Sequence, residues 1–310
     1  MGRRISPVQT PYYCSEFSLQ SGEPLFGTAS RVDVWLLLEV PRPWAEQAFP
    51  ESALPEPVKA HLNRQLESNP RSRLLFIKQS SHSAPPFAFY LARSHETDSQ
   101  LYEFRLNAYE DLLRLELPSV LAGDPHHTLS VRADPLFLVC THGTRDKCCA
   151  RFGLPAYREM RKAAPDSVWQ CSHIGGDRFA ANVLVLPHGL YYGRVTADDV
   201  PAIIEETRRG RIYLEHFRGR SRYSFPAQAA EHYLRDHTGN SEFAAFRMVK
   251  SERAGENQWT FLFASNQDGG LHQVEVVAEA EPLKGYLTCK AEKEASWVQY
   301  RLVGIESLSH

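Results

Sequence analysis

The strongest constraint on the fold is an order of strand and helix segments that occurs twice along the chain. Apolar runs and helical spacing predict strand, helix, three strands and a final helix in each pass. The first pass comprises 32–40, 55–66, 73–78, 87–93, 101–106 and a helical stretch from about Tyr109. The second comprises 136–140, a helix that Pro155 opens and that runs to about Ala164, 168–174, 183–186, 191–195 and 200–210.

Two successive β-α-β-β-β-α units predict an α/β fold with tandem thioredoxin-like units. Beyond Arg220, a helix at about 227–237 precedes segments that predict a small antiparallel sheet: 244–249, 260–264, 272–277, 286–289 and 298–303. We therefore expect a degenerate thioredoxin-like unit without ligand-type residues at 1–130, a thioredoxin-like unit whose loops carry such residues at 131–220, and an α+β appendage at 221–310. The appendage shows no chemistry, so packing or docking is expected for it.

Composition and charge argue against several classes of function. The 310 residues include 35 basic and 37 acidic side chains with no like-charge block, so neither nucleic acid nor an anionic membrane is an expected partner. No window approaches the roughly 18–20 apolar residues of a membrane-spanning helix. The first residues, Met-Gly-Arg-Arg-Ile-Ser-Pro, lack the apolar stretch of a secretory signal. We expect a globular protein of the cytoplasm.

The six cysteines are too sparse for a disulfide scaffold, and a reducing compartment would keep them as thiols or metal ligands. Cys14 and Cys289 stand alone in the sequence and are expected to be ordinary buried thiols. The other four fall within 32 residues: Cys140, Cys148, Cys149 and Cys171. This clustering is the first indication of function.

The clustered cysteines adjoin strand ends, where sites form in α/β folds. Cys140 follows a buried strand, Cys149 precedes a helix, and the next strand ends in Cys171-Ser-His173-Ile-Gly-Gly-Asp177. Thiolates are soft donors that suit iron-sulfur clusters, and an imidazole in place of a thiolate raises the reduction potential. Basic residues beside the loop would favour the thiolate forms: Arg145, Lys147 and Arg151.

Three stretches resemble the sucrase/ferredoxin-like family: Cys140 with Arg145-Asp146 and Cys149, Ser172-His-Ile-Gly-Gly-Asp-Arg-Phe-Ala-Ala-Asn182, and Leu190-Tyr-Tyr-Gly-Arg194. The similarity covers about 14–235, is strongest at 135–210, and implies a thioredoxin-like [2Fe-2S] ferredoxin. In that family two cysteines nine apart and a His-x-x-x-His pair bind the cluster. The corresponding positions here are Cys140, Cys149, His173 and Asp177.

Asp177 departs from this pattern, because a carboxylate oxygen is a harder donor than an imidazole. Three alternatives follow: Asp177 is a ligand, Cys171 or Cys148 replaces it, or the cluster is weak or absent. Cys171 and His173 share one face of a strand, which makes Cys171 a credible substitute. Asp177 is equally suited to cap a helix at Arg178-Phe-Ala-Ala. His142 is expected to be a loop residue.

The resemblance favours an electron carrier with mixed Cys/His ligation and an unidentified redox protein partner, rather than a catalyst. One alternative is a thioredoxin-like binding or regulatory module that has lost its cluster. Another is a zinc site at the same residues, although the nine-residue spacing of the cysteines is longer than that of a zinc knuckle. The vicinal pair Cys148-Cys149 is not the Cys-x-x-Cys of thiol-disulfide oxidoreductases. No carboxylate pair marks a glycosidase, so sucrose hydrolysis is not expected.

Overall fold

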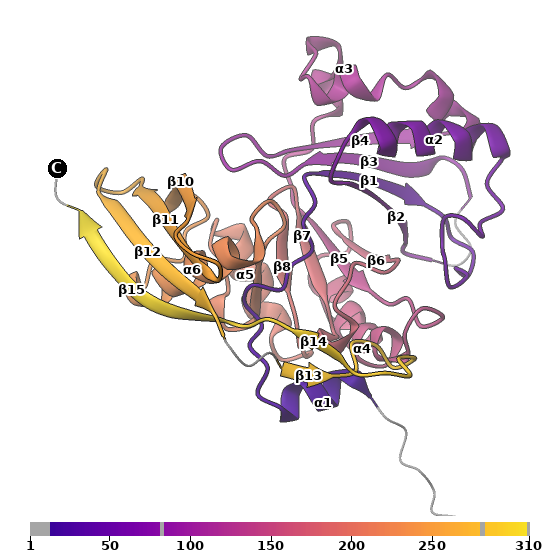
Figure 1. The fold of residues 1–310 in the computed structure, drawn as a ribbon. Coiled ribbons are helices and arrows are strands. Elements are labelled where there is room, and N and C mark those ends of the chain that lie inside the picture. Colours follow the sequence, from indigo (N-terminus) through magenta and orange to yellow (C-terminus); the bar gives the residue numbers. More distant parts are fainter. Residues whose placement is uncertain (1–12, 81–83, 280–282, 309–310) are drawn as a thin grey trace, which may run out of the picture.

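The computed structural model describes residues 13–80, 84–279 and 283–308. Within these ranges the chain folds around a nine-stranded mixed sheet, with a four-stranded and a two-stranded sheet beside it (Figure 1). No helix of the described residues is long and apolar enough to cross a membrane. Residues 1–7, in which no secretory signal is expected, lie outside the described ranges.

One part of the nine-stranded sheet is built from four strands near the start of the chain. β1 (Val34–Glu39) runs parallel to β2 (Ser72–Lys78) and antiparallel to β3 (Phe87–Arg93), which pairs with β4 (Gln100–Leu106). Five of the six residues of β1 are buried. A continuous apolar run such as Trp-Leu-Leu-Leu is typical of a strand that is covered on both faces.

The other part repeats this order and these orientations. β5 (Leu136–Cys140) runs parallel to β6 (Val168–Cys171) and antiparallel to β7 (Val183–Leu186), which pairs with β8 (Leu190–Tyr192). β9 (Phe217–Arg220) adds a further antiparallel strand beyond β8. All five residues of β5 are buried. The sheet therefore consists of two similar halves, one of which carries an extra strand.

The two halves meet where β2 pairs with β6. This antiparallel contact comprises two residue pairs, Ile77 with Cys171 and Lys78 with Gln170. Beyond it, the guanidinium of Arg73 on β2 donates hydrogen bonds to the backbone carbonyls of His173 (2.8 Å) and Ile174 (3.0 Å). The first half thus holds the loop that follows β6.

Helices connect the parallel strands in each half. α2 (Glu56–Ser68) lies between β1 and β2 and buries Val58 and Leu62. α4 (Lys147–Ala163) lies between β5 and β6, and α5 (Val200–Arg208) follows β8 and packs against α4. After β4 the chain forms a short 3-10 helix (Tyr109–Arg114), α3 (Leu117–Leu121) and a second 3-10 helix (Pro125–Ser130).

The predicted start of α4 at Pro155 is wrong, because the helix begins eight residues earlier at Lys147. The side chain of Asp146 accepts a hydrogen bond from the backbone N–H of Cys148 (2.8 Å) and caps the helix. Pro155 lies inside the helix and has no N–H to donate to the carbonyl oxygen of Arg151. Because Arg151 is exposed, water can take the place of that donor and the proline is tolerated. Cys148 and Cys149 consequently lie in the first helical turn.

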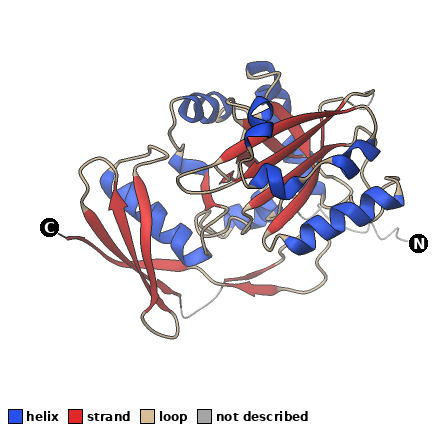
Figure 2. Ribbon diagram, turned by 90° about the horizontal axis from the view of Figure 1, so that it is seen from above, coloured by secondary structure: helices blue, strands red, loops and turns tan. Residues whose placement is uncertain are grey.

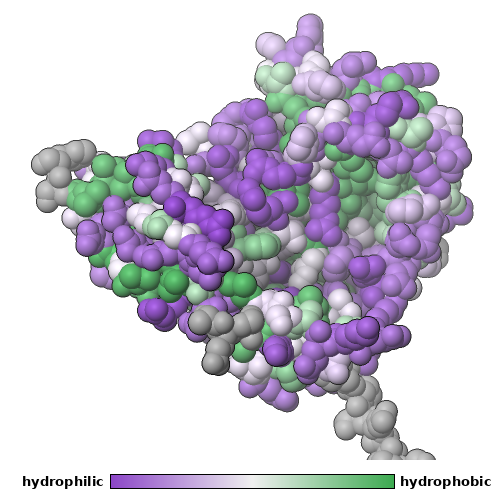
Figure 3. Space-filling view, viewed as in Figure 1, coloured by the Kyte–Doolittle hydropathy of each residue, from purple (hydrophilic) through white to green (hydrophobic). Residues whose placement is uncertain are grey.

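The C-terminal part begins with α6 (Phe225–Thr238), which packs on an antiparallel sheet to one side of the nine-stranded sheet (Figure 2). Its strands are β10 (Phe246–Arg253), β11 (Gln258–Ser265), β12 (Leu271–Ala278) and β15 (Tyr300–Leu308). Inward-facing apolar residues of β11 and β12 are fully buried. On the face drawn in Figure 3, hydrophobic side chains gather over this appended sheet. Val303 and Leu308 of β15 are among its exposed apolar residues.

The predicted strand at 286–289 is wrong. The preceding residues form β13 (Leu283–Gly285), which pairs with β14 (Ala295–Trp297), and the chain then bends and turns over 287–290. Gly285 packs against the ring of Phe17 in α1 (Cys14–Gln20), since a Cβ at this glycine would lie 2.4 Å from the ring. β13 therefore lies beside the N-terminal helix, as Figure 1 shows.

Candidate metal centre

Two of the four predicted ligand positions lie where β5 meets α4. Cys140 is the last residue of β5, and Cys149 lies in the first turn of α4. Gly153 allows this approach, because a Cβ there would lie 2.1 Å from the carbonyl oxygen of Cys140. Cys149 and Gly153 are four residues apart and share one helix face. The face of α4 that carries Cys149 therefore lies directly against the end of β5.

The other two positions lie on the loop after β6. Gly175 and Gly176 have positive φ angles of 98° and 81°, which turn the chain back on itself. This turn brings Asp177 Oδ1 to 2.9 Å from Nδ1 of His173 and to 3.1 Å from Sγ of Cys149. Asp177 begins a short 3-10 helix but does not cap it, since the N-cap residue is Gly176. Its buried carboxylate faces Cys149 and His173 instead.

The sulfur atoms of Cys140 and Cys149 and one ring nitrogen of His173 lie within 4.8 Å of one another. Both cysteines are 1% exposed, whereas the side chain of His173 is 22% exposed. His173 borders a cavity of about 210 Å³ that is also lined by Arg73 and Arg145. The imidazole is therefore the part of this group that lies nearest to solvent.

The protonation of the group follows from its contacts. The contact with Cys149 holds the pKa of Cys140 well below its usual value. Burial of Cys140 opposes this effect, and His173 adds to it. The same contact with Cys140, together with burial, raises the pKa of Cys149 well above its usual value. Burial lowers the pKa of His173, but Asp177 and Cys140 more than offset it and the pKa is about 9. These contacts favour a Cys140 thiolate beside an imidazolium.

His142 positions His173. Its Nε2 lies 2.7 Å from the carbonyl oxygen of Ala45, and its Nδ1 accepts a hydrogen bond from the backbone N–H of His173 (3.2 Å). A carbonyl only accepts, so Nε2 carries the proton and the ring is neutral. Burial lowers the pKa of His142, which agrees with a neutral ring. The residue lies in the loop, as predicted, but it is buried and orients a neighbouring site residue.

Arg218 holds the glycine turn and has no signal in the sequence that would identify it. The fully buried guanidinium donates to the carbonyl oxygen of Gly175 (3.1 Å) and to Oδ1 of Asn182 (2.7 Å). A Cβ at Gly176 would lie 2.4 Å from this guanidinium. Burial lowers the pKa of Arg218 to about 10. The two glycines therefore let the loop close over a buried cation.

Neither alternative fourth ligand belongs to the group of Cys140, Cys149 and His173, although Cys171 packs beside Cys140 and Cys149 in the same core cluster. Cys171 pairs in register with Cys140, and its thiol is fully buried in the sheet, where burial raises its pKa well above the usual value. Cys148 belongs to a second group with Cys14, Asp146 and Cys289. Successive residues of an α-helix point about 100° apart, so the vicinal cysteines face different groups. The sequence gives no sign of this second group, because Cys14 and Cys289 are 275 residues apart.

The fold and the Cys140, Cys149 and His173 group define an α/β protein with a candidate metal centre at the strand ends. A family model described as Sucrase/ferredoxin-like matches residues 25–219. The chain belongs to the sucrase/ferredoxin-like family, and the assignment made from its motifs is confirmed.

Curated relatives include Altered inheritance of mitochondria protein 32 from two yeasts. The protein from Meyerozyma guilliermondii is 33% identical over 97 residues, which are 28% of this chain and 34% of that protein. The protein from Debaryomyces hansenii is 35% identical over 95 residues, which are 27% of this chain and 35% of that protein. The similarity thus spans about a third of the length of these relatives.

Similar solved structures include a thioredoxin-like [2Fe-2S] ferredoxin from Aquifex aeolicus. This protein is 17% identical, and the match covers 27% of this chain and 88% of that chain with a TM-score of 0.24. A cysteine-to-serine variant of the same ferredoxin matches at 17% identity and a TM-score of 0.25, over 27% of this chain and 97% of that chain.

Proposed function

We propose that the chain is an electron-transfer protein that holds a [2Fe-2S] cluster through Cys140, Cys149, His173 and Asp177. The observation that carries the proposal is the convergence of two thiols and an imidazole within 4.8 Å at the strand ends. Thiolate and imidazole are ligands of such clusters, so this donor set fits. A bound cluster would supply one-electron oxidation and reduction.

The four side chains divide into two pairs with different surroundings. Cys140 and Cys149 come from β5 and α4 and are buried, which suits a pair of ligands to one iron. His173 and Asp177 come from one loop and would bind the other iron. Because His173 borders the cavity with Arg73 and Arg145, a redox protein partner would exchange electrons from that side. His142 and Arg218 keep the loop in place.

The repeated strand order supports a further part of the proposal, which concerns architecture. We propose two tandem thioredoxin-like units at 1–130 and 131–220, with cluster ligands only in the second, and an appendage at 221–310. The same parallel and antiparallel pairings in both halves of the sheet support this division. A cytoplasmic location is retained as a proposal, to be tested by fractionation of the source cells.

The test is a metal and spectroscopic analysis of the anaerobically purified full chain. Absorption and low-temperature EPR spectra are recorded before and after dithionite, with iron and acid-labile sulfide quantified on the same sample. We expect about two irons and two sulfides per chain and an S = 1/2 signal after reduction. Cys140→Ser should lose the iron, whereas the matched control Cys171→Ser should keep it. Iron-free wild-type protein that cannot be reconstituted would contradict the proposal.

Two substitutions test the second pair of ligands. His173→Cys should lower the reduction potential, because a thiolate adds negative charge to the cluster. Asp177→His should raise the potential, because an imidazole replaces a carboxylate and removes negative charge. Asp177→Asn is the control for loss of charge without a new ring nitrogen. Potentials that do not move in His173→Cys would remove His173 from the ligand set.

A module without a cluster is the second candidate, and the contacts of Asp177 favour it. This carboxylate already accepts a hydrogen bond from Cys149 and pairs with His173, so the polar groups satisfy one another. The same metal analysis distinguishes the candidates. Iron-free protein that loses no zinc on Cys140→Ser would support the binding module, whereas zinc lost on Cys140→Ser would assign zinc to this group.

A further inference from the structure

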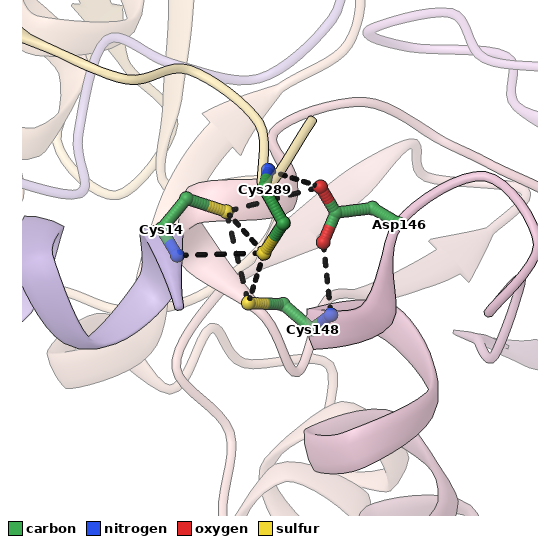
Figure 4. Close-up of side chains that lie close together, drawn as sticks. All are labelled: Cys14, Asp146, Cys148 and Cys289. Atoms are coloured by element: carbon green, nitrogen blue, oxygen red, sulfur yellow. Dashed lines mark hydrogen bonds between the residues drawn. The ribbon is translucent and has the colours of Figure 1, made fainter. Parts of the chain in front are cut away.

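A second group of metal-type side chains lies at the other side of the first turn of α4 (Figure 4). It comprises Cys14 from α1, Cys148 from α4, Cys289 from the turn at 287–290, and Asp146, which caps α4. The Sγ–Sγ distances are 3.7 Å for Cys14–Cys148, 3.2 Å for Cys148–Cys289 and 3.6 Å for Cys289–Cys14. Three thiols from distant segments therefore form a compact triangle.

These distances resemble those of sulfur ligands on a single tetrahedral ion. Three sulfurs at about 2.3 Å from zinc would lie about 3.8 Å from one another. The observed sulfurs lie within 0.6 Å of that spacing. A disulfide would use two of the three sulfurs and leave the third without a partner of its kind. The triangle thus matches a shared ion better than a disulfide.

Asp146 supplies a fourth donor. Its Oδ2 lies 4.0 Å from Sγ of Cys14, and one oxygen of this carboxylate lies within 4.8 Å of all three sulfurs. Two backbone N–H groups hold the carboxylate in place: Cys148 donates to Oδ1 (2.8 Å) and Cys289 donates to Oδ2 (2.6 Å). The carboxylate is therefore oriented by both segments that supply sulfurs beside it.

Burial and charge point to a cation. Cys14, Cys148 and Asp146 are 0% exposed, and Cys289 is partly exposed. Among the described residues no basic side chain pairs with Asp146, and the nearby cations of Lys147 and Arg151 stack on the ring of Tyr13. A buried carboxylate beside thiols requires compensation by a cation or a proton. A divalent ion would provide it for all four groups together.

We propose that Cys14, Cys148, Cys289 and Asp146 bind a structural zinc ion. Three sulfurs and one oxygen complete a tetrahedral shell, and the burial of the group leaves no open position for a reactant. The ion would join segments that are 134 residues (Cys14 and Cys148) and 141 residues (Cys148 and Cys289) apart. It would thereby fasten the two-stranded sheet of the C-terminal part to α1 and α4.

The test is the zinc content of the full chain purified without chelators, measured by inductively coupled plasma mass spectrometry. We expect about one zinc per chain in the wild type and in Cys140→Ser. Cys289→Ser and Cys14→Ser should lose the zinc and keep the iron of the wild type. Cys171→Ser is the matched control, because that thiol is buried outside both groups. Zinc-edge X-ray absorption should show three sulfurs at about 2.3 Å and one lighter atom at about 2.0–2.2 Å.

Three outcomes would overturn the zinc site, and the first two do not bear on the iron-sulfur proposal. One is wild-type protein that takes up no zinc from buffer containing it. Another is a disulfide among Cys14, Cys148 and Cys289 in peptides prepared without reductant. The third is zinc that is lost from Cys140→Ser but kept by Cys289→Ser, which would place the ion in the first group and also contradict a cluster there. Cys289 lies on a peripheral turn, so Cys289→Ser provides a folded variant even if Cys14→Ser does not fold.

Discussion

Replacing Gly153 by alanine sets two effects of one methyl group against each other. In an interior helix position, alanine is favoured over glycine by about 0.8–1.0 kcal/mol. The added Cβ, however, would lie 2.1 Å from the carbonyl oxygen of Cys140, and such contacts essentially never fall below 3.0 Å. The backbones of α4 and β5 would have to separate by about 0.9 Å. Overpacking of this kind costs about 1–3 kcal/mol and occasionally more.

We therefore expect Gly153→Ala to lower the free energy of unfolding by about 1–2 kcal/mol, measured by urea unfolding with far-UV circular dichroism. Iron content should fall as well, because Cys149 is on the same helix face and would move away from Cys140. Arg158→Gly, at an exposed position of α4, is the control: it should cost about 0.5–1 kcal/mol and leave the iron unchanged. A Gly153→Ala protein that is about 1 kcal/mol more stable with full iron content would refute the reasoning.

Three further predictions concern stability. Glu231 is the buried counter-charge of Arg220 and Arg235, so Glu231→Gln should lower the free energy of unfolding by about 3 kcal/mol. Glu205→Gln, at an exposed ion pair, is the control and should change it by less than about 0.5 kcal/mol. Similar losses for the two variants in urea unfolding would contradict this prediction. Arg218→Lys should lower the free energy of unfolding by about 3 kcal/mol, because one ammonium group cannot reach both acceptors of the planar guanidinium, on Gly175 and Asn182. An unchanged midpoint of urea unfolding would show that Arg218 does not hold the glycine turn. Burial, with a smaller effect of a nearby arginine, lowers the pKa of His188 from 6.5 to about 4, so the unfolded chain binds a proton that the folded chain does not. Stability should fall as pH decreases from 6.5 toward 4, by about 1–2 kcal/mol at pH 5, and His188→Gln should remove this loss; identical pH profiles for the two proteins would count against it.

The sheet could be predicted from the sequence wherever a strand is covered on both faces. The predicted bounds of β3, β5 and β7 are those of the structure, because continuous apolar runs end at Gly, Pro or polar residues there. The start of α4 differs from the prediction because Asp146 caps the helix and Pro155 is tolerated inside it at an exposed position. The strand predicted at 286–289 has the aromatic and β-branched residues of a strand but has no partner strand beside it in the described residues.

The first candidate site was accessible to sequence reasoning because its residues occur in two short motifs. The resemblance of these motifs to the family selects Cys140, Cys149, His173 and Asp177. The structure brings Cys140, Cys149 and His173 together and places Asp177 in contact with Cys149 and His173. The second group was not accessible. Its members Cys14 and Cys289 meet only because the segment around β13 crosses α1, and no local pattern encodes that crossing. Arg218 was missed for the same reason, since its acceptors lie far from it in the sequence.

The hydrogen bonds from Arg73 make the candidate site depend on both halves of the sheet. This residue belongs to the half of the sheet that carries no candidate ligands, yet it holds the backbone of His173 in the other half. A substitution at Arg73 would therefore disturb the candidate site from a strand that supplies none of its side chains. A shortened chain that lacks β2 would leave the edge of β6 unpaired and open to pairing with other chains.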